Sequence, residues 1–219
     1  MVEVSASFLN VEKENSIQTI YNLEASGIDY FHIDVMDGKF VKNNTVDRMR
    51  EYTEYMKQIA NTKIEVHLMV EEVESYVKSY LDIGVNSITF HIESLKNEME
   101  ILKMISYIKK HDTQVGLSIN PKTKIEQIYP YLPYIHKVLV MSVEPGAGGQ
   151  KFLPEARERI QTLNKAIYEN GFEIDIEVDG GINAQTALEV IEAGANILVA
   201  GSYIVTSENY KEAIKNLRG

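Results

Sequence analysis

The sequence predicts an α/β fold in which eight strand–helix units close into a (β/α)8 TIM barrel. Short, β-branched apolar runs alternate with amphipathic stretches, and strict alternation implies parallel strands joined by right-handed crossovers. Eight units in 219 residues give about 27 residues each, at the lower end of the ~200–250 residues of such barrels. A doubly wound open sheet is the alternative, but it usually has fewer strands and a glycine-rich first turn. Ser7-Phe8-Leu9-Asn10 follows the first predicted strand instead.

The strands are predicted where short runs are apolar and rich in β-branched side chains. In chain order these runs are Val2–Phe8, Tyr30–Val35, Lys63–Met69, Ser87–His91, Gln114–Ile119, Lys137–Ser142, Ile174–Val178 and Ile197–Ala200. Helices are predicted where apolar residues recur with helical spacing, at Ile17–Ala25, Val46–Ile59, Val73–Ile83, Met99–Ile108, Ile125–Tyr131, Glu155–Tyr168, Ala184–Ala193 and Glu208–Leu217. The weakest helical pattern of the eight is that of Ile125–Tyr131.

The chain is expected to form one domain, residues 1–219. It contains no linker, low-complexity tract or break in composition, and 44% hydrophobic with 25% charged residues is an ordinary globular composition. The repeating units share no consensus sequence, so their period reflects strand–helix geometry and not a solenoid.

The net charge and the residue types absent from the chain exclude several classes of function. Thirty-two acidic residues against 22 basic ones give a net charge of −10, which argues against a general nucleic-acid or anionic-membrane binder. A local phosphate site is still possible, because backbone N–H groups can hold phosphate without lysine or arginine. The absence of cysteine excludes disulfides and thiolate metal sites. With no apolar run near ~20 residues and no secretory pattern, we expect a cytoplasmic protein.

Polar side chains at the ends of predicted strands indicate a metal site. Catalytic residues of barrels come from the C-terminal ends of strands, where His32, Asp34, His67 and Asp179 are found. Imidazole and carboxylate ligands suit one divalent ion per chain, and Zn²⁺, Mn²⁺, Fe²⁺ and Co²⁺ are all compatible with them. His91 also ends a strand, and we interpret it as a structural neighbour of this cluster instead of a ligand.

Three glycine-containing loops in the second half of the chain predict a phosphate site. They follow the sixth, seventh and eighth strands and contain Gly146, Ala147, Gly148 and Gly149, then Gly180 and Gly181, then Gly201 and Ser202. Barrel enzymes often bind phosphate with their last loops, and glycine lets backbone N–H groups approach the oxygens closely.

Three methionines, Met36, Met69 and Met141, fall near strand ends beside the proposed cluster. They have two interpretations, soft packing of the core or a dry, polarizable lining around a charged intermediate.

The motifs at these strand ends resemble one known family over nearly the whole chain. His32-Ile-Asp-Val-Met-Asp-Gly38, Val66-His-Leu-Met-Val70, Pro145-Gly-Ala-Gly-Gly-Gln150 and Glu177-Val-Asp-Gly-Gly-Ile182 are similar to the signatures of D-ribulose-5-phosphate 3-epimerases. The resemblance implies a (β/α)8 barrel of the ribulose-phosphate-binding type. It also implies metal-dependent epimerisation at C3 of a ketose phosphate, D-ribulose 5-phosphate to D-xylulose 5-phosphate, through an enediolate.

The resemblance also implies roles for individual residues. The metal ligands match His32, Asp34, His67 and Asp179, and the acid–base pair matches Asp34 and Asp179. Substrate contacts match Ser7, His67, the loop 146–149, the segment 179–181 and Gly201-Ser202. We expect a small ketose phosphate as the partner and a homo-oligomer as the assembly.

The sequence departs from the family pattern at the walls of the site. Lys39 and Lys42 replace a histidine and a proline that are frequent after the second strand, and Glu144 and Ala147 replace an asparagine and a phenylalanine of the phosphate loop. None of these changes touches the predicted metal cluster. A sister activity, the epimerisation of a hexulose 6-phosphate such as allulose 6-phosphate, fits the pattern almost as well.

Two other classes of function are disfavoured by particular residues. Decarboxylases and aldolase-like synthases on related barrels carry a lysine on the third strand, where this chain has Glu65-Val-His67. A non-catalytic sugar-phosphate-binding barrel would be expected to lose Asp34 or Asp179, and both are present.

Overall fold

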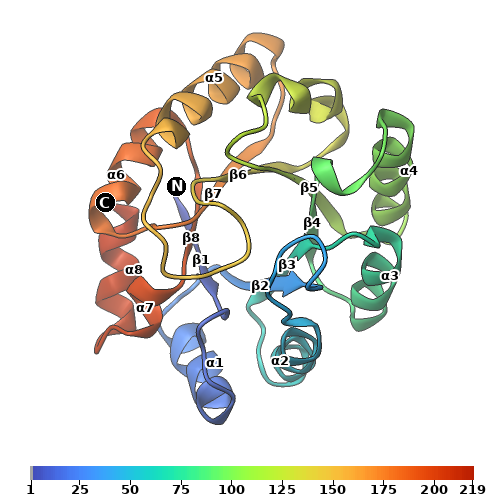
Figure 1. Cartoon of the computed structure of the whole chain (residues 1–219). Helices are drawn as coiled ribbons and strands as arrows, with labels where there is room; N and C mark the ends of the chain where they lie inside the picture. Colours follow the sequence, from blue (N-terminus) through green and yellow to red (C-terminus); the bar gives the residue numbers. More distant parts are fainter. Residues whose placement is uncertain (1) are drawn as a thin grey trace.

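Eight parallel strands close into a barrel in sequence order, with β8 paired to β1 (Figure 1). The computed structural model describes residues 2–219. Its strands are β1 (Glu3–Ser7), β2 (Tyr30–Met36), β3 (Lys63–Met69), β4 (Ser87–His91), β5 (Gln114–Ile119), β6 (Lys137–Met141), β7 (Asp175–Asp179) and β8 (Ile197–Ala200). The predicted barrel is confirmed, and each predicted strand lies within about two residues of the observed bounds.

Helices cover the outside of the barrel. They are α1 (Ser16–Ala25), α2 (Val46–Ile59), α3 (Val73–Ile83), α4 (Glu98–Lys109), α5 (Glu155–Asn170), α6 (Ala184–Ala193), α7 (Ser202–Val205) and α8 (Tyr210–Arg218). Short 3-10 helices are η1 (Lys13–Asn15) and η2 (Ile92–Ser94). The short helix α7 lies between β8 and α8, in a position where the sequence pattern predicted no element.

The prediction of an α-helix at Ile125–Tyr131 was wrong. The chain there forms η3 (Ile125–Tyr134), a 3-10 helix that contains Pro130 and Pro133. Proline has no backbone N–H, and its ring clashes with the preceding turn, so two prolines so close together prevent a regular α-helix. Ile128 and Leu132 are still buried, so this segment covers the barrel as a helix would.

Successive residues of a strand face two different buried regions, the inside of the barrel and the layer between the strands and the helices. On β2, all seven residues are buried, as expected for a parallel strand covered on both sides. Phe31 and Ile33 belong to the apolar core between the strands and the helices, and each buried side chain of this kind contributes ~1.5–3 kcal/mol. His32 and Asp34, one position further along, belong to the opposite face and so to the barrel interior.

Two loops at the C-terminal ends of strands meet across the barrel opening. The Asn43 side chain, in the β2–α2 loop, donates a hydrogen bond to the carbonyl oxygen of Gly146, in the β6–α5 loop, at 2.6 Å. The Gln150 side chain donates hydrogen bonds to the carbonyl oxygens of Glu144 and Ala147, and these bonds within the β6–α5 loop stabilise its conformation. Figure 1 shows this loop, in yellow, extending over the opening.

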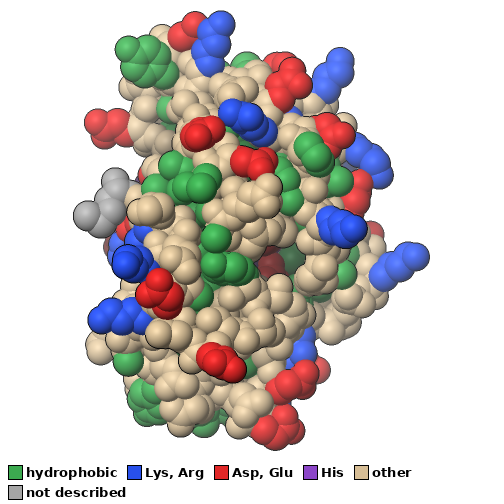
Figure 2. Space-filling model, turned by 90° about the vertical axis from the view of Figure 1, so that its left-hand side faces the viewer, with side chains coloured by type: hydrophobic (Ala, Val, Ile, Leu, Met, Phe, Trp, Pro, Cys, Tyr) green, Lys and Arg blue, Asp and Glu red, His purple; other side chains and the backbone are tan. Residues whose placement is uncertain are grey.

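The surface is mixed in charge. Figure 2 shows one side of the molecule, on which acidic and basic side chains alternate around small groups of hydrophobic ones. Among the helices within residues 2–219, none combines the length and the apolarity that a membrane crossing requires.

Candidate active site

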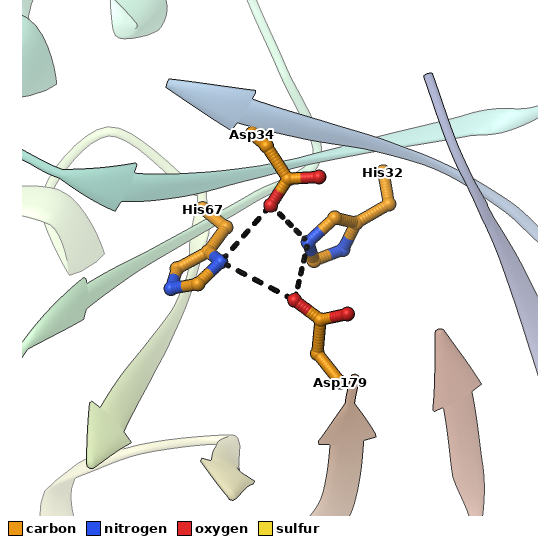
Figure 3. A group of neighbouring side chains, drawn as sticks. All are labelled: His32, Asp34, His67 and Asp179. Atoms are coloured by element: carbon orange, nitrogen blue, oxygen red, sulfur yellow. Dashed lines mark hydrogen bonds and ion pairs between the residues drawn. The ribbon is translucent and has the colours of Figure 1, made fainter. Parts of the chain in front are cut away.

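Four side chains from three strands converge inside the barrel (Figure 3). His32 and Asp34 come from β2, His67 from β3 and Asp179 from the last position of β7. One donor atom of each lies within 4.8 Å of the others. The sequence-predicted cluster is therefore assembled in space.

The spacing of the donor atoms suits a divalent cation. Oδ1 of Asp34 lies 3.3 Å from Nε2 of His32 and 3.2 Å from Nδ1 of His67. Oδ2 of Asp179 lies 3.9 Å and 3.8 Å from the same two nitrogens. Ligands bound about 2 Å from a tetrahedral zinc ion stand roughly 3.3 Å apart. Nε2 of His32 is buried without a hydrogen-bond partner among residues 2–219, which is costly unless something else binds it. The four residues could hold one divalent ion.

His91 lies behind the cluster, where it contacts His67. The two Nε2 atoms are 2.8 Å apart, and Nδ1 of His91 lies 3.4 Å from Oε2 of Glu93. With a cation in the cluster, Nδ1 of His67 would be a ligand, so its Nε2 would carry the proton and donate to His91, whose Nδ1 lies near Glu93. This relay would leave the Nδ1 lone pair of His67 available to the cation.

The two acids of the cluster have opposite pKa shifts. Burial, together with the negative charge of Asp34, raises the pKa of Asp179 to about 8. Burial alone would raise the pKa of Asp34 too, but the neighbouring charge of His32 and the contact with His67 outweigh it and lower the pKa well below its usual range. Burial lowers the pKa of His67 to about 4, so its imidazole is neutral at pH 7.

A cavity of about 520 Å³ opens above the cluster, which is a size suited to a small metabolite. Its lining includes Asp34, Asp179 and the predicted phosphate-loop residues Gly146, Ala147, Gly148, Gly149, Gly180, Gly181, Gly201 and Ser202. The backbone N–H groups of Gly180, Gly181 and Gly201 donate no hydrogen bond to another of the residues 2–219. These donors are available to an anionic ligand.

The remaining predicted lining residues also reach this cavity, with one exception. Met36, Met69 and Met141 are buried and line it, so they take part both in packing and in the wall of the cavity, and the dry lining stays a prediction. Ser7 lines it as well, and its hydroxyl donates to Oδ2 of Asp34 at 2.7 Å. His67 lies in the buried cluster and outside the cavity lining, so its contact with substrate stays a prediction.

Three of the four family departures have a defined place. Lys39 pairs with Glu72 at 3.1 Å, and Glu144 pairs with Lys122 at 2.7 Å. All four of these side chains are exposed, and such ion pairs contribute little to stability. Ala147 lines the cavity, so this replacement changes the wall around a ligand.

Several site residues were not predicted. The cavity is also lined by Asn10, Phe152, Asn183, Thr186 and Tyr203, which lie in loops or in the first turn of a helix that follows a loop, where apolar periodicity gives no signal. Glu65 and Glu177 are buried in the barrel interior, two residues before His67 and Asp179. Their spacing was a usable signal, because residues two apart on a strand share a face.

Gly181 is the glycine whose replacement we expect to damage the cavity most. Its φ is +65°, and a Cβ there would lie 2.5 Å from the backbone nitrogen of Phe152, so Gly181→Ala must displace the β6–α5 loop. We expect kcat/KM for the ketose phosphate that the sequence predicts as substrate to fall by about 10²-fold, as for other small displacements of binding groups. Gly171→Ala is the matched control, since its φ is +66° with no atom within 4 Å of the added Cβ. Equal kcat/KM values for the two variants would contradict this expectation.

Binding of a cation is expected to release protons. The pKa of Asp179 is about 8 without a cation, so its carboxyl group is mostly protonated at pH 7 and must ionise to become a ligand. Affinity for Zn²⁺ should therefore fall as the pH is lowered, by about tenfold per pH unit for each proton displaced. Calorimetric titrations in buffers of different ionisation enthalpy count the protons. Asp179→Asn should release one proton fewer, and an unchanged count would contradict the assignment.

Comparisons with known proteins agree with this geometry. A sequence model of the ribulose-phosphate 3 epimerase family matches residues 3–205. The ribulose-phosphate 3-epimerase of Methanocaldococcus jannaschii is 39% identical over 218 residues, which cover 100% of this chain and 90% of the relative. That of Bacillus subtilis is 36% identical over 220 residues, which cover 100% and 99%.

Solved structures show the same fold in more distant enzymes. A 3-hexulose-6-phosphate synthase superposes with a TM-score of 0.72 at 15% identity, over 99% of this chain and 98% of the other. Phosphoribosylanthranilate isomerase from Thermotoga maritima superposes with a TM-score of 0.70 at 15% identity, over 100% of both chains. At such identity only the fold is shared. The family match and the closely similar relatives, in contrast, span nearly all of the sequence, and the chain is an enzyme that belongs to the ribulose-phosphate 3-epimerase family.

Proposed function

We propose that this chain interconverts D-ribulose 5-phosphate and D-xylulose 5-phosphate by moving a proton at C3 between two carboxylates. The reaction removes the C3 proton next to the C2 carbonyl and returns a proton to the opposite face of the planar enediolate. One proton-transfer group is needed on each face. Asp34 on β2 and Asp179 on β7 meet this need, because they enter the cavity from different sides of the barrel.

The observation that carries the proposal is the position of these two acids. Their facing oxygens lie within 4.8 Å of each other, and they come from strands on different sides of the barrel. Before a cation binds, the pKa of Asp34 is lowered and that of Asp179 is raised to about 8, so the pair can hold one proton between them. As the proton moves across the substrate, the two residues exchange the roles of base and acid.

His32, Asp34, His67 and Asp179 would hold the divalent ion that the donor set suits, Zn²⁺, Mn²⁺, Fe²⁺ or Co²⁺. Bound there, the ion would supply Lewis-acid polarisation of the C2 carbonyl and stabilise the negative charge that develops. Ser7 keeps Asp34 oriented through its hydrogen bond to Oδ2. Met36, Met69 and Met141 line the space above the acids and would limit the access of water to it.

The glycine loops would hold the phosphate at the other end of the cavity. The N–H groups of Gly180, Gly181 and Gly201 are available for it, and the β6–α5 loop completes the wall. Binding energy from the phosphate, which does not react, holds C3 between the two carboxylates.

The proposal is tested with a substrate panel after metal removal and reconstitution. We expect the highest kcat/KM for D-ribulose 5-phosphate and very poor turnover of unphosphorylated ribulose. Allulose 6-phosphate is the second candidate, because Ala147 lines the cavity where related sequences often carry phenylalanine and leaves room for a longer ketose. A higher kcat/KM for allulose 6-phosphate would replace the pentose assignment. Equal turnover of free ribulose would refute the phosphate site.

A further inference from the structure

A buried group of three charged side chains lies inside the barrel beneath the metal cluster. Glu65 comes from β3, Lys137 from β6 and Glu177 from β7, and their exposed fractions are 1%, 4% and 0%. Charged side chains are almost never buried to this extent unless they are paired. We call these three residues the buried triad.

The barrel makes room for the lysine. Lys137 lies opposite Gly116 in the register of β5 and β6. A Cβ at Gly116 would lie 2.9 Å from Cγ of Lys137 and 2.4 Å from Oγ1 of Thr89, so only glycine leaves space for the lysine stem. The ammonium group thus reaches the centre of the barrel.

Contacts within the triad connect Lys137 to a metal ligand. Nζ of Lys137 contacts Oε2 of Glu65 and lies 2.8 Å from Oε2 of Glu177. The other oxygen of each glutamate faces His32, whose Nδ1 lies 2.9 Å from Oε1 of Glu65 and 3.7 Å from Oε1 of Glu177. The Ser5 hydroxyl also donates to Oε1 of Glu65. Lys137 is therefore connected to His32 in two ways, through the carboxylate of Glu65 and through that of Glu177.

Charge explains why the lysine is present. Two buried carboxylates side by side repel each other, and the ammonium group of Lys137 contacts both of them and offsets this repulsion. Burial would lower the pKa of Lys137, but the pair of glutamates outweighs burial and raises it, so the ammonium stays charged. A charged Lys137 can then hold both glutamates in fixed orientations.

We infer that Lys137 is a positioning residue for the metal ligand His32. By fixing Glu65, it keeps an acceptor 2.9 Å from Nδ1, so that with a cation bound His32 carries its one proton there and presents the Nε2 lone pair to the cluster. Nε2 of His32 is buried and has no hydrogen-bond partner among residues 2–219, as expected of a nitrogen that binds a cation. The inference rests on the proposed function only in requiring that the cluster binds a cation.

Lys137→Met tests the inference, because methionine keeps much of the stem and removes the charge. We expect Zn²⁺ to bind about 10- to 100-fold more weakly, the usual effect of losing a group that orients a ligand, when measured by competition with a fluorescent chelator. Lys63→Met is the matched control. Both lysines lie near the ring of Tyr30, with Nζ of Lys63 5.1 Å and Nζ of Lys137 5.7 Å from the ring centre. Lys63, in contrast, is exposed. Its Zn²⁺ affinity should be unchanged.

A double variant separates positioning from simple charge balance. Lys137→Met with Glu177→Gln removes one charge of each sign, so thermal stability without metal should recover towards the parent chain. Zn²⁺ affinity should stay weak, because Glu65 has still lost its ammonium partner. A ¹⁵N spectrum of the histidines should show a less protected Nδ1–H of His32 in both variants.

The outcomes that overturn the inference are distinct from failure of the proposed function. Zn²⁺ affinity of folded Lys137→Met within about threefold of the parent chain would refute it. If the double variant recovers both Zn²⁺ affinity and thermal stability, Lys137 serves only to balance charge, and its role in positioning His32 is refuted as well. These measurements use Zn²⁺ alone and no substrate, whereas the proposed function fails if the parent chain does not epimerise D-ribulose 5-phosphate.

Discussion

Removing the divalent ion is expected to lower turnover by at least about 10³, because Lewis-acid stabilisation of the developing charge is worth several kcal/mol and each 1.36 kcal/mol changes a rate tenfold. In the proposed mechanism, the C2 oxygen would then develop its negative charge beside the carboxylates of Asp34 and Asp179 with no cation to stabilise it. The measurement is turnover after dialysis against a chelator, with the residual metal determined by mass spectrometry. Adding back Zn²⁺, Mn²⁺, Fe²⁺ or Co²⁺ one at a time should restore turnover and identify the most active ion.

His67→Ala gives a genetic version of the same experiment. It removes one nitrogen ligand, so metal affinity and turnover at limiting metal should both fall. His111→Ala is the matched control, because His111 is exposed and its side chain hydrogen-bonds to the carbonyl oxygen of Tyr107, away from the cluster. Full turnover by a chain shown to be metal-free would refute the metal site. Equal metal affinity in the two variants would remove His67 from the ligand set.

The fold could be predicted because its signals are local. The strand β2 is an apolar run bounded by polar segments, and strict alternation with helices leaves few topologies. At the segment Ile125–Tyr134, these local signals predict the wrong type of helix. Its apolar spacing is helical and its inner side chains are buried, but the two prolines within it change the backbone to a 3-10 helix.

The metal cluster could be predicted for a similar reason. All strands of the barrel are parallel, so their C-terminal ends meet at one opening, and the polar residues there must lie near one another. This rule alone was enough to predict that Asp34, His67 and Asp179 lie close together. The relay from His67 through His91 was foreseen only as a neighbouring position, since ring orientations depend on three-dimensional packing.

The lysine of the buried triad could not be predicted from such rules, although the spacing of Glu65 and Glu177 was a usable signal for the two glutamates. Lys137 begins a strand, a position where lysine is normally exposed and unremarkable. Its burial depends on the register that sets it opposite Gly116 and on the reach of its stem across the barrel to Glu65. Register between strands that are far apart in the sequence is a tertiary property, and a single sequence contains little information about it.

Replacing either acid by asparagine is expected to reduce epimerisation in both directions by about 10²–10⁴, the usual contribution of general acid–base catalysis. Asparagine keeps the size of aspartate and one oxygen ligand, but it cannot take up or give a proton. If Asp34 and Asp179 serve opposite faces, each is the base for one epimer and the acid for the other. Exchange of the C3 proton with deuterium oxide, measured separately for each epimer, resolves the two steps.

The two variants should then differ in which exchange survives. Asp34→Asn keeps the base on one face and should exchange the C3 proton of one epimer without inverting it, and Asp179→Asn should do so for the other epimer. Metal content is measured first, because both acids are proposed ligands. Asp82→Asn, on the exposed side of α3, is the control and should behave as the parent chain. If both metal-loaded variants lose exchange from the same epimer, a single residue serves both faces, and the division of labour between Asp34 and Asp179 is refuted.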